Sequence, residues 1–318
     1  MPDRISKFLF MMEIGMYVRF DRWFMMLILV TGALACQSIS PTAAEVNESS
    51  AAAELSTSIA ADGSIVLVTV RAPAGMKLDE EALKGEFADF HFPFYRAGEG
   101  LFEAVLGIPY SYKPGTAEVR VLISAAEGRE AMRLALPLTI IDGNYDAEKL
   151  RVSPKHLNPS PKDMIRIRRD QKEVGAIYRN ISRTKLWDGP FRFPMNSAIT
   201  SVYGTKRVFN GQLASYHSGL DLRAAVGSRV HAPAKGKVVL AKDLFFSGKT
   251  VMLDHGYGVV TFYAHLSRMR VKKGQMVEVG QLLGLSGATG RVSGPHLHWS
   301  AVIQKNKVNP MDLIKVLK

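Results

Sequence analysis

The stretch Gly294-Pro295-His296-Leu297-His298-Trp299 carries two histidines that lie two positions apart. Residues 297–303 are typical of a β-strand. Alternation along that strand places His296, His298 and Ser300 on one face and apolar side chains on the other. The apolar face can pack on a core while both imidazoles point into a cleft. One imidazole can then bind a metal ion directly while the other reaches a water molecule beside it.

A second candidate ligand pair lies upstream, in His217-Ser218-Gly219-Leu220-Asp221. In an extended strand, residues i and i+4 lie about 13 Å apart, whereas two ligands of one zinc ion each lie about 2 Å from it. His217 and Asp221 can therefore share a metal only if the chain bends between them. Gly219 permits such a bend, so the sequence predicts a turn at Ser218-Gly219.

A further histidine, His265, ends the strand-like run 259–265. Alternation along this run predicts that Thr261, Tyr263 and His265 share one face of a sheet. The other histidines stand apart from these patterns and are predicted to be structural or incidental: His91, His156, His231 and His255.

Two histidines and one aspartate would leave an open fourth position on zinc, as hydrolysis requires. Zinc would lower the pKa of a bound water to about 7 and polarise a carbonyl group. No H-E-x-x-H segment supplies a glutamate base, so the remaining histidines would take the acid–base role. The single cysteine, Cys36, excludes an intramolecular disulfide and a cysteine-rich zinc site. From the residues alone, a scatter of unrelated structural histidines stays open as the alternative.

In their order along the chain, the H-x3-D, Tyr263-Ala264-His265-Leu266 and H-x-H motifs resemble those of the LytM/lysostaphin-type zinc metallopeptidases. The resemblance extends over about residues 191–312. It includes further segments at Val202-Tyr203-Gly204, Val230-His231-Ala232-Pro233, Gly236-Lys237-Val238, residues 274–284 and Val308-Asn309-Pro310. It implies that His217, Asp221 and His298 bind one Zn²⁺ per chain. It further implies that His265 and His296 are catalytic and that the fold is a β-sheet with a groove.

The resemblance also implies a function: a zinc-dependent endopeptidase that hydrolyses peptide bonds of bacterial peptidoglycan, in cross-links or in stem peptides. The alternative is a non-enzymatic module that binds peptidoglycan or activates another cell-wall hydrolase. Relatives that take such a role lose zinc ligands, and none is lost here, so the enzyme is preferred. A third alternative is a peptidase that acts on proteins. The bond that is cleaved stays open.

The length of 318 residues and the hydrophobic content of 47% predict a globular chain with two domains. Strand-like runs separated by turn signals favour a mainly β fold, with a small β-sandwich-like domain over residues 59–142 and a metallopeptidase domain over 191–318. Residues 143–190 are predicted to link them through a basic helix with Ser160 as its N-cap. That helix, predicted to end near residue 182, is either a solvated connector or a surface for the second domain or an anionic polymer. Residues 37–58 are predicted to be a flexible tether.

Residues 1–36 are typical of a targeting segment. Arg19 and Arg22 precede an apolar run of signal-peptide length, and Ala33-Leu34-Ala35 matches a cleavage pattern. Three outcomes stay open: a cleaved signal peptide, lipidation at Cys36, or an uncleaved membrane anchor. All three predict export to the periplasm or cell envelope, the last two with membrane attachment.

The formal net charge of +12 favours an anionic partner, and peptidoglycan fits that description. No zinc-finger, RRM-like or homeodomain-like pattern supports a nucleic-acid partner, and none is predicted. The oligomeric state stays open.

Overall fold

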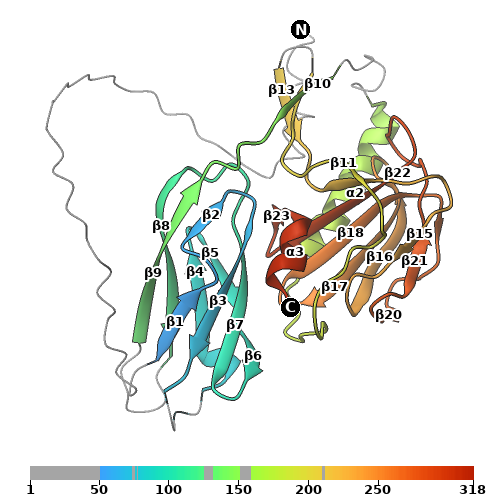
Figure 1. Ribbon diagram of the computed structural model, residues 1–318. Coiled ribbons are helices and arrows are strands. Elements are labelled where there is room, and N and C mark those ends of the chain that lie inside the picture. The colour runs from blue at the N-terminus through green and yellow to red at the C-terminus, as the bar shows by residue number, and fades with distance from the viewer. Residues whose placement is uncertain (1–50, 74–75, 77, 125–131, 151–158, 210–211) are drawn as a thin grey trace, which may run out of the picture.

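The computed structural model describes residues 51–73, 76, 78–124, 132–150, 159–209 and 212–318 (Figure 1). The predicted targeting segment, His156 and most of the predicted tether lie outside these residues. Within the described ranges, no helix is both long enough and apolar enough to span a membrane. The chain forms a β-sandwich, on the left of Figure 1, beside a larger β-rich domain, so the predicted mainly β fold is confirmed.

Two sheets of the N-terminal half pack face to face as the sandwich. One has the strand order β1-β3-β7-β6, with bounds Ala52–Leu55, Ile65–Arg71, Leu101–Gly107 and Tyr95–Gly98. The other has the order β2-β9-β8-β4-β5, with bounds Ile59–Ala61, Met132–Ile141, Gly115–Ile123, Leu83–Phe87 and Phe90–Pro93. A short 3-10 helix, Glu80–Ala82, precedes β4. Alternate residues of β8 (Val119, Val121 and Ile123) are buried between the sheets, as a period of two requires.

Strand β1 corrects part of the predicted tether over residues 37–58. Ala52–Leu55 pairs antiparallel with β3, and Ala51 before it is only 5% exposed. Ala53 and Leu55 pack against the sandwich core, because alternation turns both toward it. The small side chains that suggested a flexible tether here complete the edge of a sheet.

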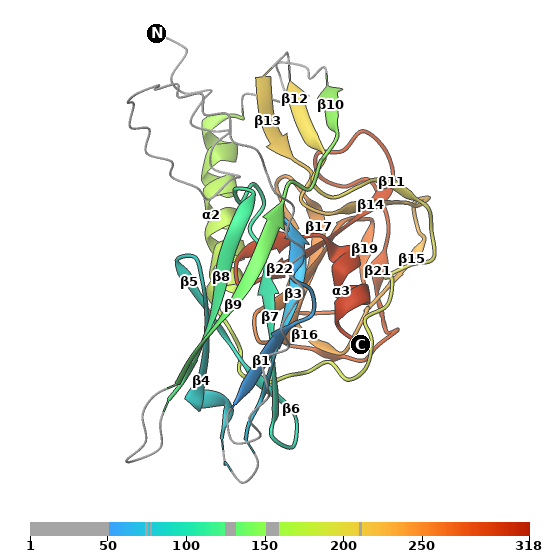
Figure 2. The ribbon, with the colours of Figure 1, turned by 60° about the vertical axis from the view of Figure 1, so that its left-hand side comes forward.

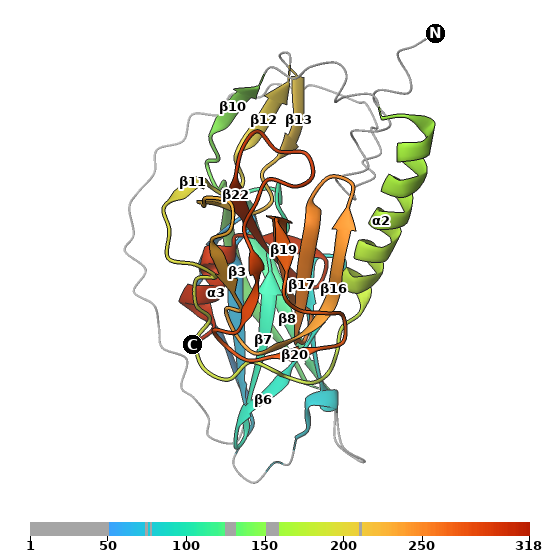
Figure 3. The same cartoon turned by 90° about the vertical axis from the view of Figure 1, so that its right-hand side faces the viewer.

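The predicted basic helix is present as α2, Pro161–Arg179, and it ends three residues before the predicted position. Ser160 is its N-cap, as predicted, because its Oγ accepts a hydrogen bond from the backbone N–H of Asp163 at 3.2 Å. The helix packs on the C-terminal domain beside β16 (Figure 3), where Ile177 and Tyr178 contact a buried apolar cluster. Of the two interpretations, the surface that meets the second domain is therefore correct.

The main sheet of the C-terminal domain has the order β11-β14-β22-β18-β17-β16-β20. The bounds are Ile199–Ser201, Leu220–Arg223, His296–Ile303, Val259–Leu266, Gly248–Gly256, Gly236–Leu244 and Met276–Val277, and β23, Asn306–Val308, pairs with β22. Two small sheets flank it: β15-β21-β19 (Arg229–His231, Leu282–Leu285 and Arg268–Met269) and β10-β12-β13 (Ala147–Leu150, Lys206–Phe209 and Gln212–Tyr216). The short helix α3, Pro310–Val316, follows.

The two domains share one hydrophobic core. Ile65, Tyr95 and Val105 of the sandwich belong to the same buried cluster as the main sheet of the C-terminal domain. Gln304 Nε2 donates to Val105 O at 2.8 Å across this boundary, near the place where β7 lies against β22 (Figure 2). Strand β7 also contacts β23 there. The sandwich is therefore packed against the domain that carries the candidate site.

Candidate metal centre

The pairing of β14 with β22 brings the first candidate ligands together. Asp221 lies directly opposite His298 in this antiparallel pair, so the two side chains share a face. His217, just before β14, completes the group. His217 Nε2 lies 3.0 Å from Asp221 Oδ1 and 3.1 Å from His298 Nδ1, and that Nδ1 lies 2.9 Å from Asp221 Oδ1. Among the described residues, this is the group of three whose possible ligand atoms all lie within 4.8 Å of one another.

The chain bends at Gly219, as the spacing of His217 and Asp221 predicts. A second reason for glycine appears in the packing. A Cβ at position 219 would lie 2.5 Å from Trp299 O and 2.8 Å from His298 Cε1. Glycine is therefore required because β22 approaches the bend too closely for any side chain.

Hydrogen bonds on the outer side of each ligand ring fix its orientation. His217 Nδ1 lies 2.8 Å from Val202 O, which can only accept, so Nδ1 carries the proton. The neutral ring then presents an unprotonated Nε2 toward Asp221 Oδ1. His298 Nε2 is held by Ser300 Oγ at 2.8 Å. Outer partners of this kind orient metal ligands and set their tautomers.

The donor set fits a zinc ion. Lone pairs of one carboxylate oxygen and two imidazole nitrogens converge on one point, and a bound cation would relieve the repulsion between them. Burial acts to raise the pKa of Asp221, but the close contacts with His217 and His298 outweigh it and hold that pKa well below its ordinary value. Burial lowers the pKa of His298 to about 4, so this ring is neutral at pH 7 and free to ligate.

Two further imidazoles stand beside these three groups. His296, the first residue of β22, has Nδ1 2.9 Å from Gly294 O, which leaves Nε2 facing Asp221 Oδ1 at 3.6 Å. His265 has Nδ1 2.9 Å from the carbonyl oxygen of Thr289, so its Nε2 is likewise unprotonated in the neutral ring. The rings of His265 and His296 lie 4.9 Å apart. Burial lowers the pKa of His265 to about 4. All five candidate residues therefore meet at one place.

The predicted face of His265 was wrong. Tyr263 lies opposite Trp299 and both are fully buried, so regular alternation would carry His265 to that core face as well. His265 instead has φ of +61°, a conformation that side chains other than glycine rarely adopt. Its backbone N–H donates to Ser247 O at 2.9 Å, which anchors this irregularity. The left-handed residue turns the imidazole to the face of His298, and such backbone strain is typical of functional sites.

The sandwich also reaches the segment that carries His217. Tyr110 stacks on Tyr216, with ring centroids 3.7 Å apart and planes at 7°. Its hydroxyl donates to Gly204 O at 3.1 Å, and Gly204 N–H in turn donates to His217 O at 2.8 Å. The N-terminal domain thus buttresses a ligand of the candidate metal centre, through contacts that no sequence motif indicates.

The other described histidines lie outside this group. His255 is fully buried, between Lys235 O and Thr261 Oγ1, each 2.8 Å from a ring nitrogen. His91 is exposed on the edge strand β5 and lies 3.3 Å from Glu86. Sequence reasoning missed the carbonyl partners of the site histidines, because a carbonyl oxygen leaves no trace in a residue pattern.

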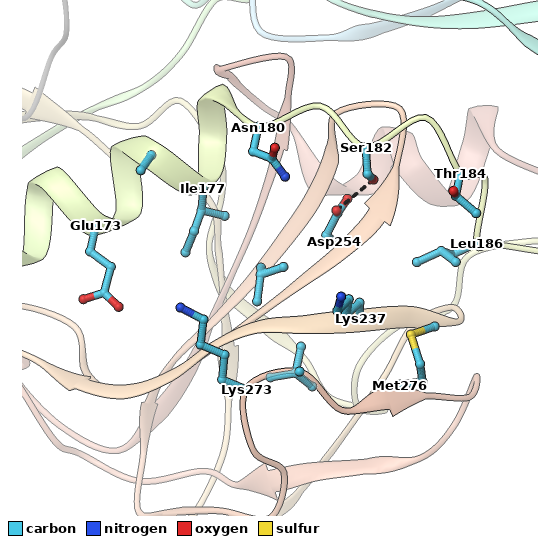
Figure 4. A pocket seen from close by; sticks show the side chains of 14 residues that line it. Glu173, Ile177, Asn180, Ser182, Thr184, Leu186, Lys237, Asp254, Lys273 and Met276 are labelled. Atoms are coloured by element: carbon cyan, nitrogen blue, oxygen red, sulfur yellow. Dashed lines mark hydrogen bonds between the residues drawn. The ribbon is translucent and has the colours of Figure 1, made fainter.

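A pocket of about 740 Å³ lies elsewhere, between the C-terminal end of α2 and the β16–β17 strands (Figure 4). Its wall includes Glu173, Lys237 and Lys273, with Asp254 held by Ser182 at 2.8 Å. None of the five candidate residues lines it. The candidate metal centre on the histidine face of the sheet is therefore separate from this pocket.

Comparison with known proteins agrees with this geometry. The sequence model of peptidase family M23 matches residues 215–310, which include all five candidate residues. A Pseudomonas aeruginosa protein assigned to peptidase M23 superimposes on 80% of this chain and 94% of its own, with 32% identity and a TM-score of 0.60. The catalytic domain of lysostaphin from Staphylococcus simulans is 32% identical over 38% of this chain and 93% of its own, with a TM-score of 0.34.

Among curated proteins, the peptidoglycan DD-endopeptidase ShyA of Vibrio cholerae is 38% identical over 123 residues, which is 38% of this chain and 29% of ShyA. The chain thus spans less than a third of the length of this relative. By contrast, the match to the Pseudomonas aeruginosa structure covers 94% of that protein at 32% identity. The chain belongs to peptidase family M23.

Proposed function

We propose that this chain is a zinc-dependent endopeptidase that hydrolyses peptide bonds of bacterial peptidoglycan. In this proposal His217, Asp221 and His298 hold one zinc ion per chain, and His265 and His296 are the catalytic groups. The observation that carries this proposal is the convergence of three possible ligand atoms beside two further imidazoles. In each of those two imidazoles, Nδ1 is hydrogen-bonded to a backbone carbonyl. Relatives named as peptidoglycan DD-endopeptidases support the substrate class.

Zinc, when bound, supplies a Lewis acid and favours ionisation of water. The protein supplies the remaining chemistry. His265 and His296 each donate Nδ1–H to a backbone carbonyl, so each presents Nε2 as the atom that can accept a proton from an attacking water. Once protonated, the same Nε2–H can donate to the developing oxyanion or to the leaving amine.

The setting of the proposed enzyme is the periplasm or cell envelope, where peptidoglycan is found. Membrane attachment through residues 1–36 or Cys36 remains part of the proposal. The competing function is a non-enzymatic peptidoglycan-binding module or an activator of another hydrolase. The complete ligand set and the two additional histidines favour the enzyme, since a binding module needs neither.

The test is digestion of purified peptidoglycan followed by mass spectrometry of the released muropeptides, which also identifies the bond. We expect release that a chelator abolishes and added zinc restores. His298→Ala is expected to be inactive, whereas His91→Ala, which removes an exposed histidine of the sandwich, is expected to match the wild type. Release that persists in the chelated protein or in His298→Ala would rule the proposal out. Zinc analysis of the purified protein separates the alternative, because a binding module need not hold one zinc per chain.

A further inference from the structure

A guanidinium stands next to the candidate catalytic histidines. The β14–β22 register that pairs Asp221 with His298 continues to pair Arg223 with His296. Residues 221 and 223 lie on the same face of β14 because side chains alternate. Directly opposite residues in an antiparallel pair have Cβ atoms about 4.5–5.5 Å apart. Arg223 is therefore the immediate cross-strand neighbour of His296, on the face where the site lies.

The backbone of Arg223 is held by hydrogen bonds, whereas its guanidinium has no oxygen partner among the described residues. Its N–H donates to Ala198 O at 2.9 Å, and its carbonyl accepts from Ser197 Oγ. The side chain is exposed, and its guanidinium makes no hydrogen bond or ion pair with any residue of the described ranges. By contrast, the half-buried Arg166 of α2 contacts both Asp170 and Asp243.

Arg223 makes no ion pair with Asp221, the carboxylate of the site. Asp221 Oδ1 is already contacted by His217 and His298, at 3.0 and 2.9 Å. A second guanidinium, that of half-buried Arg207 on β12, has a buried Nε that no described residue hydrogen-bonds. The surroundings of the site thus hold unpaired positive charge, which favours an anionic ligand.

We propose that Arg223 binds a carboxylate of the substrate peptide close to the scissile bond, and so selects peptides with a free carboxylate over amidated ones. This inference rests on the proposed function. Guanidinium is suited to the task, because its planar fork donates two parallel hydrogen bonds to a carboxylate. The position opposite His296 puts this contact close to the bond that is cleaved, since the same histidine serves the reacting atoms.

The experiment compares two substrates and three variants, using the full chain loaded with zinc. The substrates are a cross-linked dimeric muropeptide with free carboxylates and the same muropeptide after its carboxylates have been converted to carboxamides. The variants are Arg223→Gln, Arg223→Lys and a matched control, Arg133→Gln, which removes an exposed arginine of sandwich strand β9. Thermal unfolding of all three variants checks that the fold is retained.

We expect Arg223→Gln to lower kcat/KM for the free-carboxylate muropeptide at least about tenfold, the range of hydrogen bonds to charged groups. For the amidated muropeptide it should change kcat/KM by no more than about twofold, a difference typical of surface substitutions. For the free-carboxylate muropeptide, Arg223→Lys is expected to have a kcat/KM between those of the wild type and Arg223→Gln, because lysine keeps the charge but lacks the planar fork of the guanidinium. Arg133→Gln should match the wild type on both substrates.

Equal losses on the two substrates, or no loss on either, would overturn the role of Arg223 and leave the proposed function intact. If the wild type cleaves neither muropeptide, the proposed function is wrong. The role of Arg223 in carboxylate binding is then tested by measuring binding alone. Dissociation constants of both muropeptides are then measured. The inference stands if Arg223→Gln weakens binding of the free form at least tenfold more than that of the amidated form, and it is wrong if the two change alike.

Discussion

Replacing Gly219 with alanine should damage the candidate metal centre without touching a ligand. An added Cβ lies 2.5 Å from Trp299 O, whereas ordinary contacts begin at about 3.4 Å, so β22 and the bend must separate by about 0.9 Å. Trp299 O is backbone and cannot rotate away. The same Cβ lies 2.8 Å from His298 Cε1, so the displacement acts on the ligand itself.

A shift of this size is large beside the tolerance of about 0.2 Å in metal–ligand distances. We expect zinc affinity to fall about 10–100-fold, the loss typical when the outer support of a metal ligand is disturbed. Overpacking should also lower the free energy of unfolding of the metal-free protein by about 1–3 kcal/mol.

The assay for Gly219→Ala is competition with a chromophoric chelator for zinc affinity, together with urea unfolding of the metal-free protein. Gly98→Ala is the matched control, because an added Cβ there meets only Leu101, at 3.7 Å. Its zinc affinity should equal that of the wild type. If Gly219→Ala bound zinc as tightly as the wild type, the reasoning would be refuted, since β22 could then shift to accommodate the added Cβ without displacing His298.

Three other perturbations test the site and its surroundings. His298→Ala is expected to lose both bound zinc and activity, whereas His296→Ala should keep most of its zinc and lose activity, as measured by zinc content after dialysis and by muropeptide release. His255 has its pKa lowered by burial to about 4, below the ordinary 6.5, so the folded state binds fewer protons than the unfolded state and stability is lost as pH falls from about 6.5 to about 4. Between pH 7 and pH 5, the free energy of unfolding measured with urea should fall by about 2 kcal/mol less in His255→Gln than in the wild type. Tyr110→Ala removes the stack on the segment before His217, and should lower the free energy of unfolding by about 1–3 kcal/mol and weaken zinc binding, both measurable with the assays used for Gly219→Ala.

Each of these has an opposite outcome that counts against it. Equal zinc loss in His298→Ala and His296→Ala would show that the division of labour between the two histidines is wrong. An unchanged pH slope in His255→Gln would assign the acid sensitivity to other groups. Unaltered zinc affinity in Tyr110→Ala would limit the sandwich contact to stability.

Much of the fold followed from local patterns. Strand-like runs at residues 259–265 and 297–303 predicted β18 and β22, and the Ser160-Pro161 start predicted where α2 begins, because an N-cap and a first-turn proline act over a few residues only. Strand β1 and the packing of α2 did not follow from local patterns. Whether small side chains such as those at residues 51–55 are tethered or buried depends on the sheet beside them, which lies far away in the sequence.

The sequence by itself determined which residues could bind a metal and that the chain had to bend between His217 and Asp221, since these conclusions need only residue chemistry and the rise of a strand. Tertiary structure decided the rest. The register of β14 against β22 placed Asp221 beside His298 and Arg223 beside His296, and no local rule fixes the register between strands about 75 residues apart. A single left-handed residue at His265 reversed the face that alternation predicts, because a positive φ depends on contacts such as that with Ser247 and not on the run of residues around it.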